Sequence, residues 1–330
     1  MQASLDTPTD GRYSAVEQMT AMAFPQRNTR QQASGQGTSD SRQQPKAPLL
    51  MPRALAGALL RLYDVPDPRR PDRLIRGYDR LHALRTARMC TAVAAELGHP
   101  PDRLRQYQIA CLLHDLGRAG LDRKQFGAIW SWARRRGIPT RPREWRAIHP
   151  NTVYGRETEA FLALYTDKLE RAGIPMDRWS QAQVEMRLGY ARRLSRRLRE
   201  VKPKLQDLGV QWKPWMALVM LYYYYPEKLE GAKPWVRQLA EVLVACEQFE
   251  AYSNRRRGED YYTRSRETLA EAFGYLEKLR LEGILSDPVV QTLRSLAARG
   301  AFDRILEEAR GCVLSARERR VLKRLAKGVV

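Results

Sequence analysis

The sequence predicts an all-α protein, and three observations support this fold class. Beyond Asp72 the apolar residues recur at helical spacing almost everywhere; Ala83, Ala87 and Cys90, for example, share one helix face. No segment alternates apolar and polar residues for long enough to indicate a strand, and no internal repeat is present. Glycines and prolines separate the helical segments, as expected where helices end.

The composition divides the chain into a tail, a short helix, a main domain and an extension. Residues 1–48 are rich in Gln, Ser, Thr and Gly, and we expect them to be a disordered tail. Residues 49–71 are predicted to hold a short amphipathic helix, Met51 to Tyr63, and a proline-rich linker. The main helical domain is predicted over 72–296 with an inserted charged helical segment at about 165–212, and 297–330 form a basic helical extension.

The first two helices of the main domain are separated by a glycine-proline turn. His82 lies on the apolar strip of the first helix and can face inward, and Gly98 ends that helix. Asp102 is the expected N-cap of the second helix, which runs into His114-Asp115 and ends at Gly117.

Four further helices are expected along the chain. One begins near Thr140 and carries His149, whereas Trp215 to Tyr225 forms a strongly apolar helix. Trp235 to Cys246 forms another apolar helix, and Glu247 follows it directly. Phe302 to Lys327 is predicted as a basic amphipathic helix or helix pair that packs on the core or contacts a protein partner.

The chain of 330 residues has a formal net charge of +21 and an isoelectric point near 10.2. This arginine-led excess points to anionic partners, either a phosphate-bearing small molecule or nucleotide, or nucleic acid, but also fits a solvated basic surface. No zinc-finger spacing and no aromatic-plus-basic RNA-binding signature is present. No apolar run approaches the roughly 18 residues of a membrane span, and the N-terminus lacks a signal-peptide pattern. The four cysteines show no CxxC spacing, so we expect reduced thiols in a cytoplasmic protein.

The most informative segment is Ile109-Ala-Cys-Leu-Leu-His114-Asp115-Leu-Gly-Arg118. An apolar run delivers an adjacent imidazole and carboxylate, and burying such a pair without a partner is costly. A metal ion is an economical partner for a neutral imidazole beside a carboxylate. Three of the four histidines, His82, His114 and His149, fall on successive predicted helices. Glu247 leaves a second apolar helix, and Glu250 competes with it for the same role.

The order of these residues resembles the HD superfamily of metal-dependent phosphohydrolases, and in particular its HD-GYP branch. His114-Asp-Leu-Gly-Arg118 is similar to the HDxGK motif of that branch. Ile148-His149-Pro150 resembles its helix with a metal-ligand His-Pro, and Glu247-Gln-Phe249-Glu250-Ala251 resembles its DVFDAL segment. Glu282-Gly283 to Asp287-Pro288 resembles its terminal GxxFDP, so the likeness runs from about Tyr78 to Leu296.

The resemblance implies an HD-domain helical bundle and a set of metal ligands. A first metal would be held by His82, His114, Asp115 and Glu247, with Glu247 in place of an aspartate. A second metal would retain Asp115 and His149 alone, because Tyr225-Pro226 stand where the branch has paired histidines. We therefore expect one bound divalent transition metal (Mn, Fe, Co, Ni or Zn), with at most a weak second.

The function that this resemblance implies is hydrolysis of a phosphoester or nucleotide. Known HD-GYP members hydrolyse cyclic di-GMP, but the missing GYP segment puts that substrate in doubt here. Asp115 would hold the metal and orient a water molecule, and Arg118 and Lys124 would neutralise charge on the phosphate. Tyr225 and Arg255 are candidates for substrate binding.

Two alternatives stay open at this point. The chain could be a catalytically inactive HD-GYP-like module that binds a nucleotide or a protein partner, which the lost histidine pair favours. It could also be a nucleic-acid-binding protein, which the net charge favours.

Overall fold

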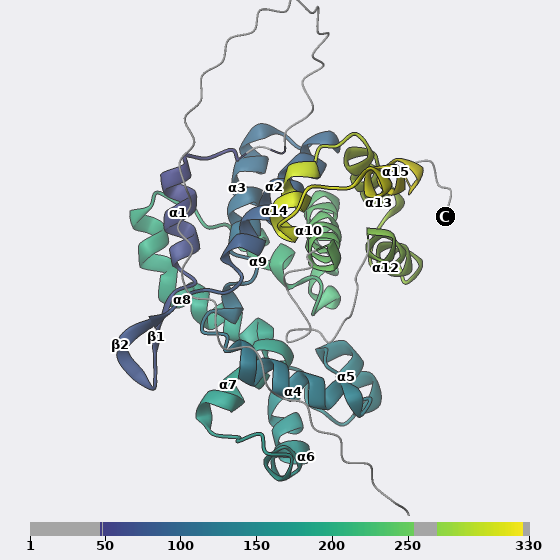
Figure 1. The fold of residues 1–330 in the computed structure, drawn as a ribbon. Coiled ribbons are helices and arrows are strands. Elements are labelled where there is room, and N and C mark those ends of the chain that lie inside the picture. The colour runs from purple at the N-terminus through teal and green to yellow at the C-terminus, as the bar shows by residue number, and fades with distance from the viewer. Residues whose placement is uncertain (1–46, 48, 254–268, 326–330) are drawn as a thin grey trace, which may run out of the picture. The chain divides into compact units, whose positions relative to one another are not determined.

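The computed structural model describes residue 47 and residues 49–253 and 269–325, which are mostly helical (Figure 1). The all-α prediction is confirmed for this part of the chain. The predicted tail at 1–48 lies, apart from Ala47, outside the described residues, and so does Arg255. Among the described helices, none is both long enough and apolar enough to cross a membrane.

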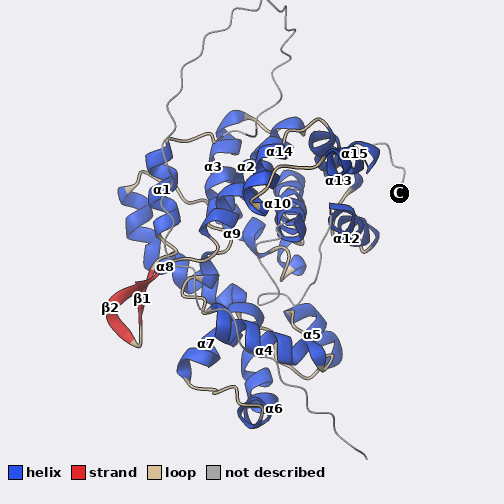
Figure 2. Cartoon of the chain, viewed as in Figure 1, coloured by secondary structure: helices blue, strands red, loops and turns tan. Residues whose placement is uncertain are grey.

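The elements follow one another along the chain, with two short 3-10 helices labelled η and with strands coloured red in Figure 2. They are α1 (Arg53–Arg61), β1 (Val65–Asp67), β2 (Arg70–Ile75), α2 (Arg80–Glu96), α3 (Pro101–Leu112), η1 (Leu116–Arg118), α4 (Arg123–Arg135), α5 (Pro142–Ile148), α6 (Glu157–Arg171), α7 (Arg178–Leu188), α8 (Tyr190–Asp207), α9 (Pro214–Leu221), η2 (Pro226–Leu229), α10 (Pro234–Ser253), α12 (Leu269–Leu281), α13 (Asp287–Ala298), α14 (Asp303–Arg310) and α15 (Ala316–Leu325).

The proline-rich segment after α1, predicted as a linker, belongs to an antiparallel hairpin of β1 and β2. The Asp67 carboxylate accepts a hydrogen bond of 3.0 Å from the Arg69 backbone N–H and so closes the tight turn. The strands are short, and the described side chains of β2 are mostly exposed. The sequence of this segment therefore does not alternate between apolar and polar residues, which is the usual signal of a strand.

Several helix ends differ from the expected positions. α3 begins at Pro101, because proline suits the first position of a helix, and Asp102 makes no capping hydrogen bond. α3 also ends at Leu112, so His114 and Asp115 lie in the turn that follows it. α10 does not end at Cys246 but continues to Ser253.

The larger hydrophobic core surrounds α10, which is buried over nearly all of its length from Leu239 to Glu250. α10 packs against α2, α9, α12, α13 and α14 (Figure 1). α2 packs in turn against α3. A helix that is apolar nearly all round is stable when neighbours cover every face, and this is the position of α10.

A second hydrophobic cluster lies among α4, α5, α6 and α7. Trp130 is fully buried at its centre, and its ring centroid is 5.3 Å from that of Phe161. Trp145 of α5 lies on the other side of Phe161, at 5.8 Å. The first part of the predicted insertion, which comprises the end of α6 and α7, therefore shares a core with α4 and α5.

Replacing Trp130 by alanine should lower the free energy of unfolding by about 3–5 kcal/mol, because a large buried side chain leaves a cavity. Leu164→Ala on α6 is the matched control, since that side chain is 49% exposed. The control should change stability by less than about 0.5 kcal/mol in the same urea titration. Equal effects of the two substitutions would contradict this assignment of the cluster.

Candidate metal centre

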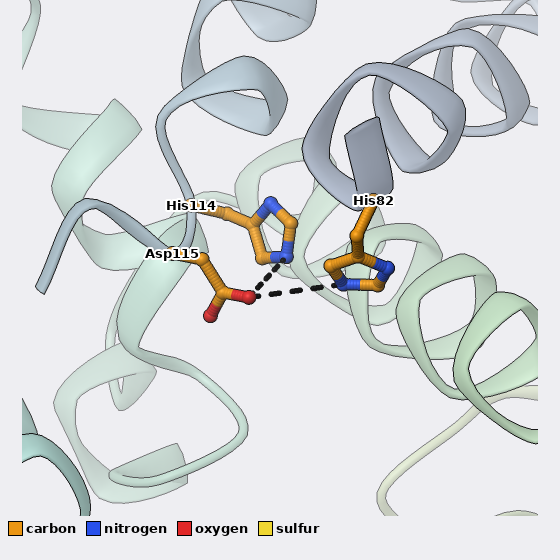
Figure 3. A group of neighbouring side chains, drawn as sticks. All are labelled: His82, His114 and Asp115. Atoms are coloured by element: carbon orange, nitrogen blue, oxygen red, sulfur yellow. Dashed lines mark ion pairs between the residues drawn. The ribbon is translucent and has the colours of Figure 1, made fainter. Parts of the chain in front are cut away.

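Three side chains from two parts of the sequence meet inside the larger core. His82 is the third residue of α2, and His114 and Asp115 follow the end of α3. The three side chains are only 3%, 3% and 2% exposed. Their ligand atoms lie within 4.8 Å of one another, so the group could hold a metal ion (Figure 3).

Both imidazole rings point toward the same carboxylate oxygen. The Oδ2 atom of Asp115 is 3.7 Å from Nε2 of His82 and 3.6 Å from Nε2 of His114 (Figure 3). These distances are too long for direct hydrogen bonds. The two ring centroids are 5.2 Å apart, with the planes at 63°. One oxygen and two ring nitrogens therefore converge on a common point from three directions.

The other nitrogen of each ring is held by a hydrogen-bond acceptor. Nδ1 of His114 lies 2.7 Å from the carbonyl oxygen of Cys111, and this contact requires a proton on Nδ1. In the neutral ring, Nε2 therefore carries the lone pair. Nε2 of His114 has no hydrogen-bond partner among the described residues. Nδ1 of His82 contacts the carboxylate of Glu250, which also accepts a hydrogen bond of 2.6 Å from Arg85. Such second contacts are typical of metal-binding histidines.

Arg118 contacts the same Asp115 oxygen that faces the two histidines. Its guanidinium donates to Oδ2 of Asp115 at 3.1 Å and to the Tyr224 hydroxyl at 2.6 Å. Arg118 is itself buried, so its charge offsets much of the cost of burying Asp115.

Two buried tyrosines fix the backbone at His114 and Asp115. The Tyr63 hydroxyl donates to the Leu112 carbonyl at 2.9 Å and accepts from the Asp115 N–H at 3.2 Å. The Tyr190 hydroxyl donates to the His114 carbonyl. Burial, and then the charge of Asp115, raise the pKa of both tyrosines well above the ordinary value, so both hydroxyls remain protonated donors.

Gly117 is required at its position by Tyr190. A Cβ atom on Gly117 would lie 2.6 Å from the Tyr190 ring, closer than real contacts allow. The Tyr190 ring is in turn stacked on Tyr224, with centroids 4.7 Å apart. Gly117 therefore permits Tyr190 of α8 to approach the turn that carries His114 and Asp115.

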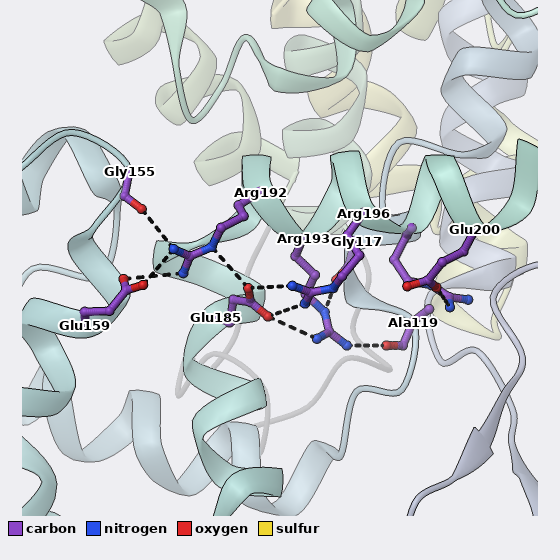
Figure 4. A network of polar contacts seen from close by, with 10 residues as sticks. Gly117, Ala119, Gly155, Glu159, Glu185, Arg192, Arg193, Arg196 and Glu200 are labelled. Atoms are coloured by element: carbon purple, nitrogen blue, oxygen red, sulfur yellow. Dashed lines mark hydrogen bonds and ion pairs between the residues drawn. The ribbon is translucent and has the colours of Figure 1, made fainter.

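α8 holds this turn with charged side chains as well (Figure 4). Arg193 donates to the carbonyls of Gly117 and Ala119 at 2.7 and 2.8 Å. Glu185 of α7 accepts from Arg193 at 3.4 Å and from Arg196 at 2.5 Å. The predicted insertion therefore braces the turn that carries Asp115.

Four other predicted site residues lie outside the group of His82, His114 and Asp115. Glu247 is buried on α10, but Glu250, one turn further on, contacts His82. The His149 ring stacks on Trp145, with centroids 4.2 Å apart. Lys124 is exposed at the start of α4. Tyr225 is buried and bonds the Leu188 carbonyl at 3.3 Å.

The residues that sequence reasoning missed are Tyr63, Tyr190 and Tyr224. Tyr224 belongs to a run of four tyrosines, Tyr222 to Tyr225, and helical spacing does not indicate which of them faces the site. Tyr63 and Tyr190 lie far from Asp115 along the chain, and no signal in the sequence connects either tyrosine to Asp115.

Comparison of the chain with protein-family models, with curated proteins and with solved structures found no match in any of the three. The interpretation of the site therefore depends on its own geometry.

Gly117→Ala should lower the free energy of unfolding by about 1–3 kcal/mol, because the added methyl group overlaps the Tyr190 ring. Gly274→Ala on α12 is the control, since nothing lies within 4 Å of the added atom. The control should be neutral or stabilising by about 0.5–1 kcal/mol, as expected within a helix. Thermal unfolding of both variants measures the difference, and an unaffected Gly117→Ala chain would contradict the close contact.

Glu185→Gln should weaken the fold at neutral pH by about 1–3 kcal/mol, because it removes charged hydrogen-bond acceptors from Arg193 and Arg196. Burial raises the pKa of Glu185, but the hydrogen bond to Arg196 and the arginine charges lower it further, to a net value below the ordinary one. The carboxylate therefore stabilises the fold above the unfolded pKa, near about 4.3, and this contribution is lost as pH falls through the lower folded pKa.

The measurement is urea unfolding of the wild-type chain and the Glu185→Gln chain between pH 7 and pH 3. The difference between the two chains should shrink toward the acid end. Glu200→Gln is the control, because the Glu200 side chain is 45% exposed in its pair with Arg197. A constant difference across the pH range would count against the charged network.

Proposed function

We propose that this chain is a metal-dependent phosphohydrolase that holds one divalent transition metal with His82, His114 and Asp115. One observation carries the proposal. The two histidine Nε2 atoms face a single Asp115 oxygen at 3.6–3.7 Å, while each Nδ1 atom is engaged by another acceptor.

The donor set fits a divalent transition metal. Two imidazoles and a carboxylate suit Mn, Fe, Co, Ni or Zn, and affinity alone does not choose among them. The His114 Nε2 atom is buried and lacks a hydrogen-bond partner among the described residues, which is costly for a polar atom unless a ligand satisfies it. The contacts of Cys111 and Glu250 hold both rings in the orientation that ligation requires.

The arrangement also supports membership of the HD superfamily as part of the proposal. A histidine on one helix, a His-Asp pair at the end of the next and an acid on a late helix are the features that the sequence shares with that superfamily. Here they are His82 on α2, His114-Asp115 after α3, and Glu250 on α10. Glu250 takes a supporting position behind His82, so the ligand set has three members from the described residues.

A divalent metal at this position would lower the pKa of a bound water toward neutrality and polarise a phosphoryl oxygen. Asp115 would hold the metal and orient that water. Arg118, fixed by Asp115 and Tyr224, would neutralise negative charge developing on the phosphate. Arg118 suits this role better than Lys124, which is exposed on α4.

A second candidate function is a binding module that has kept the fold without the chemistry. The contact of 3.1 Å between Arg118 and Oδ2 of Asp115 favours it, because a cation already neutralises the oxygen that faces both histidines. Tyr225 also bonds the Leu188 carbonyl at the position where the HD-GYP branch has a histidine.

The test is the metal content and phosphodiesterase activity of the purified chain. We expect about one transition metal per chain and turnover of bis-p-nitrophenyl phosphate. His114→Ala and Asp115→Ala should lose the metal, and turnover should fall at least about 100-fold, because each removes a direct ligand. His149→Ala is the matched control and should keep both the bound metal and the turnover.

The outcomes separate the two functions. Metal that is bound without any turnover would favour the binding module. A chain with no metal, whose melting temperature does not rise on addition of Mn²⁺ or Ni²⁺, would overturn both the metal site and the enzyme. Loss of metal in His149→Ala would show that the ligand set extends to α5.

A further inference from the structure

α15 carries exposed arginines that the proposed function does not use. It belongs to the segment predicted as a basic amphipathic helix or helix pair, in which the structure has two helices, α14 and α15. α15 packs against α12 and α13 (Figure 1), and its Leu322 side chain is only 2% exposed. The fold therefore covers the side of α15 that carries Leu322.

Three arginines lie on the opposite side of α15. Arg317, Arg320 and Arg324 are three and four residues apart, so they share one face of the helix. Leu322 is two residues from both Arg320 and Arg324, which is about 200° around the helix. All three arginines are exposed, and none makes a hydrogen bond or an ion pair within the part of the chain that the structure describes. We call these three residues the arginine stripe.

The acids beside α15 are engaged by other arginines. Arg319 pairs with Asp303 at 3.6 Å and with Glu307 at 3.3 Å, and both acids belong to α14. Glu318 of α15 pairs with Arg310, which is buried. These acids therefore leave the charges of the arginine stripe available to an external anion.

The start of α15 is fixed by hydrogen bonds. The Ser315 hydroxyl accepts from the Glu318 N–H at 3.2 Å, and the Glu318 carboxylate accepts from the Ser315 N–H at 2.9 Å, which together form a capping box. The Leu314 N–H donates to Glu307 at 3.1 Å. Gly311, at φ 69°, ends α14 in the left-handed conformation. The arginine stripe is thus presented on an ordered backbone, which lowers the entropic cost of binding.

The phosphates of a double-stranded nucleic acid suit this surface. A guanidinium can donate two parallel hydrogen bonds to one phosphate, and the formal net charge of +21 attracts a polyanion to the chain. Proteins bind single strands by stacking bases on aromatic rings, and α15 contains no aromatic residue. A membrane-surface helix needs an exposed apolar face, whereas Leu322 of α15 is buried.

The length of the arginine stripe fits the major groove of DNA. Arg317 and Arg324 are seven residues apart, which is about 10.5 Å along the helix axis. The major groove of B-DNA is about 12 Å wide and admits an α-helix, so the two end arginines can reach phosphates on both of its strands. The major groove of double-stranded RNA is deep and narrow, so this geometry favours DNA.

We propose that α15 binds double-stranded DNA through the arginine stripe, by contacts to phosphates that do not depend on base sequence. This inference goes beyond the proposed function and does not rest on it. α15 packs against α12 and α13, whereas the candidate metal ligands belong to α2 and to the turn after α3.

The experiment is a fluorescence anisotropy titration of a labelled DNA duplex, about two helical turns long, with the full chain. It is repeated between about 50 and 200 mM salt, with a chelator present throughout. Each phosphate contact contributes about 0.9 to the slope of log K against log salt. Alanine at all three positions of the arginine stripe should therefore reduce the slope by about 2.7 and weaken binding at least about tenfold at 100 mM salt.

A second triple variant is the matched control. Arg76→Ala, Arg143→Ala and Arg199→Ala remove three exposed arginines from three separate places, after β2, on α5 and on α8, and lower the net charge equally. This control should keep the slope and bind within about twofold of the wild-type chain, because scattered surface charges are largely screened. Both triple variants should melt within about 2 °C of the wild-type chain, since all six side chains are exposed.

Poly-L-glutamate tests an acidic protein as the alternative partner. Its extended chain carries one charge per about 3.3–3.6 Å, compared with about 1.7 Å in duplex DNA, so it releases fewer counterions. We expect it to bind at least about tenfold more weakly than the duplex. Equally tight binding that depends on the arginine stripe would assign this surface to an acidic protein and overturn the DNA proposal.

Two further results would overturn it: no binding of the duplex at the lowest salt concentration, or equal weakening by the two triple variants. The chelator makes the titrations independent of the metal centre. A chain that takes up no metal but binds DNA through the arginine stripe would support this inference and reject the proposed function. A chain with metal and turnover but without DNA binding would do the reverse.

Discussion

The buried carboxylate of Asp115 is the constraint around which the described structure is organised. The guanidinium of Arg118 offsets the cost of burying this negative charge. It does not account for the two histidine Nε2 atoms that face the same oxygen. Lone pairs directed at a carboxylate repel it unless a cation lies between them, and the distances are too long for direct hydrogen bonds. A metal ion between these atoms would remove the repulsion, and this is the physical basis of the proposed metal centre.

The same constraint explains why α8 is part of the site. The turn after α3 leaves backbone carbonyls of His114, Gly117 and Ala119 without helical partners, and buried carbonyls need donors. Tyr190 and Arg193 supply those donors from α8. A segment that appears as an insertion along the sequence is therefore a structural support for the turn that carries the candidate ligands.

The sequence was sufficient to predict the helical class and the grouping of His82, His114 and Asp115, because apolar periodicity and a charged pair within it are local signals. The sequence was insufficient where the packing of helices determines which side chains face the site. Both Glu247 and Glu250 lie on α10, and only the way α10 packs against α2 selects Glu250 to contact His82. Tyr224 and Tyr225 lie after the end of α9, where helical period no longer gives the direction of a side chain. The hairpin at Val65–Ile75 was missed because its short strands have no buried alternating face.

The positions of individual arginines show how part of the large positive charge of the chain is used. Arg193 and Arg196 are bound to Glu185, and Arg85 and Arg118 offset buried acids, so these four arginines have acidic partners within the fold. Such pairs leave the formal net charge of +21 unchanged, so the excess cations lie outside them. A general attraction to anions does not by itself distinguish nucleic acid from a small phosphorylated ligand.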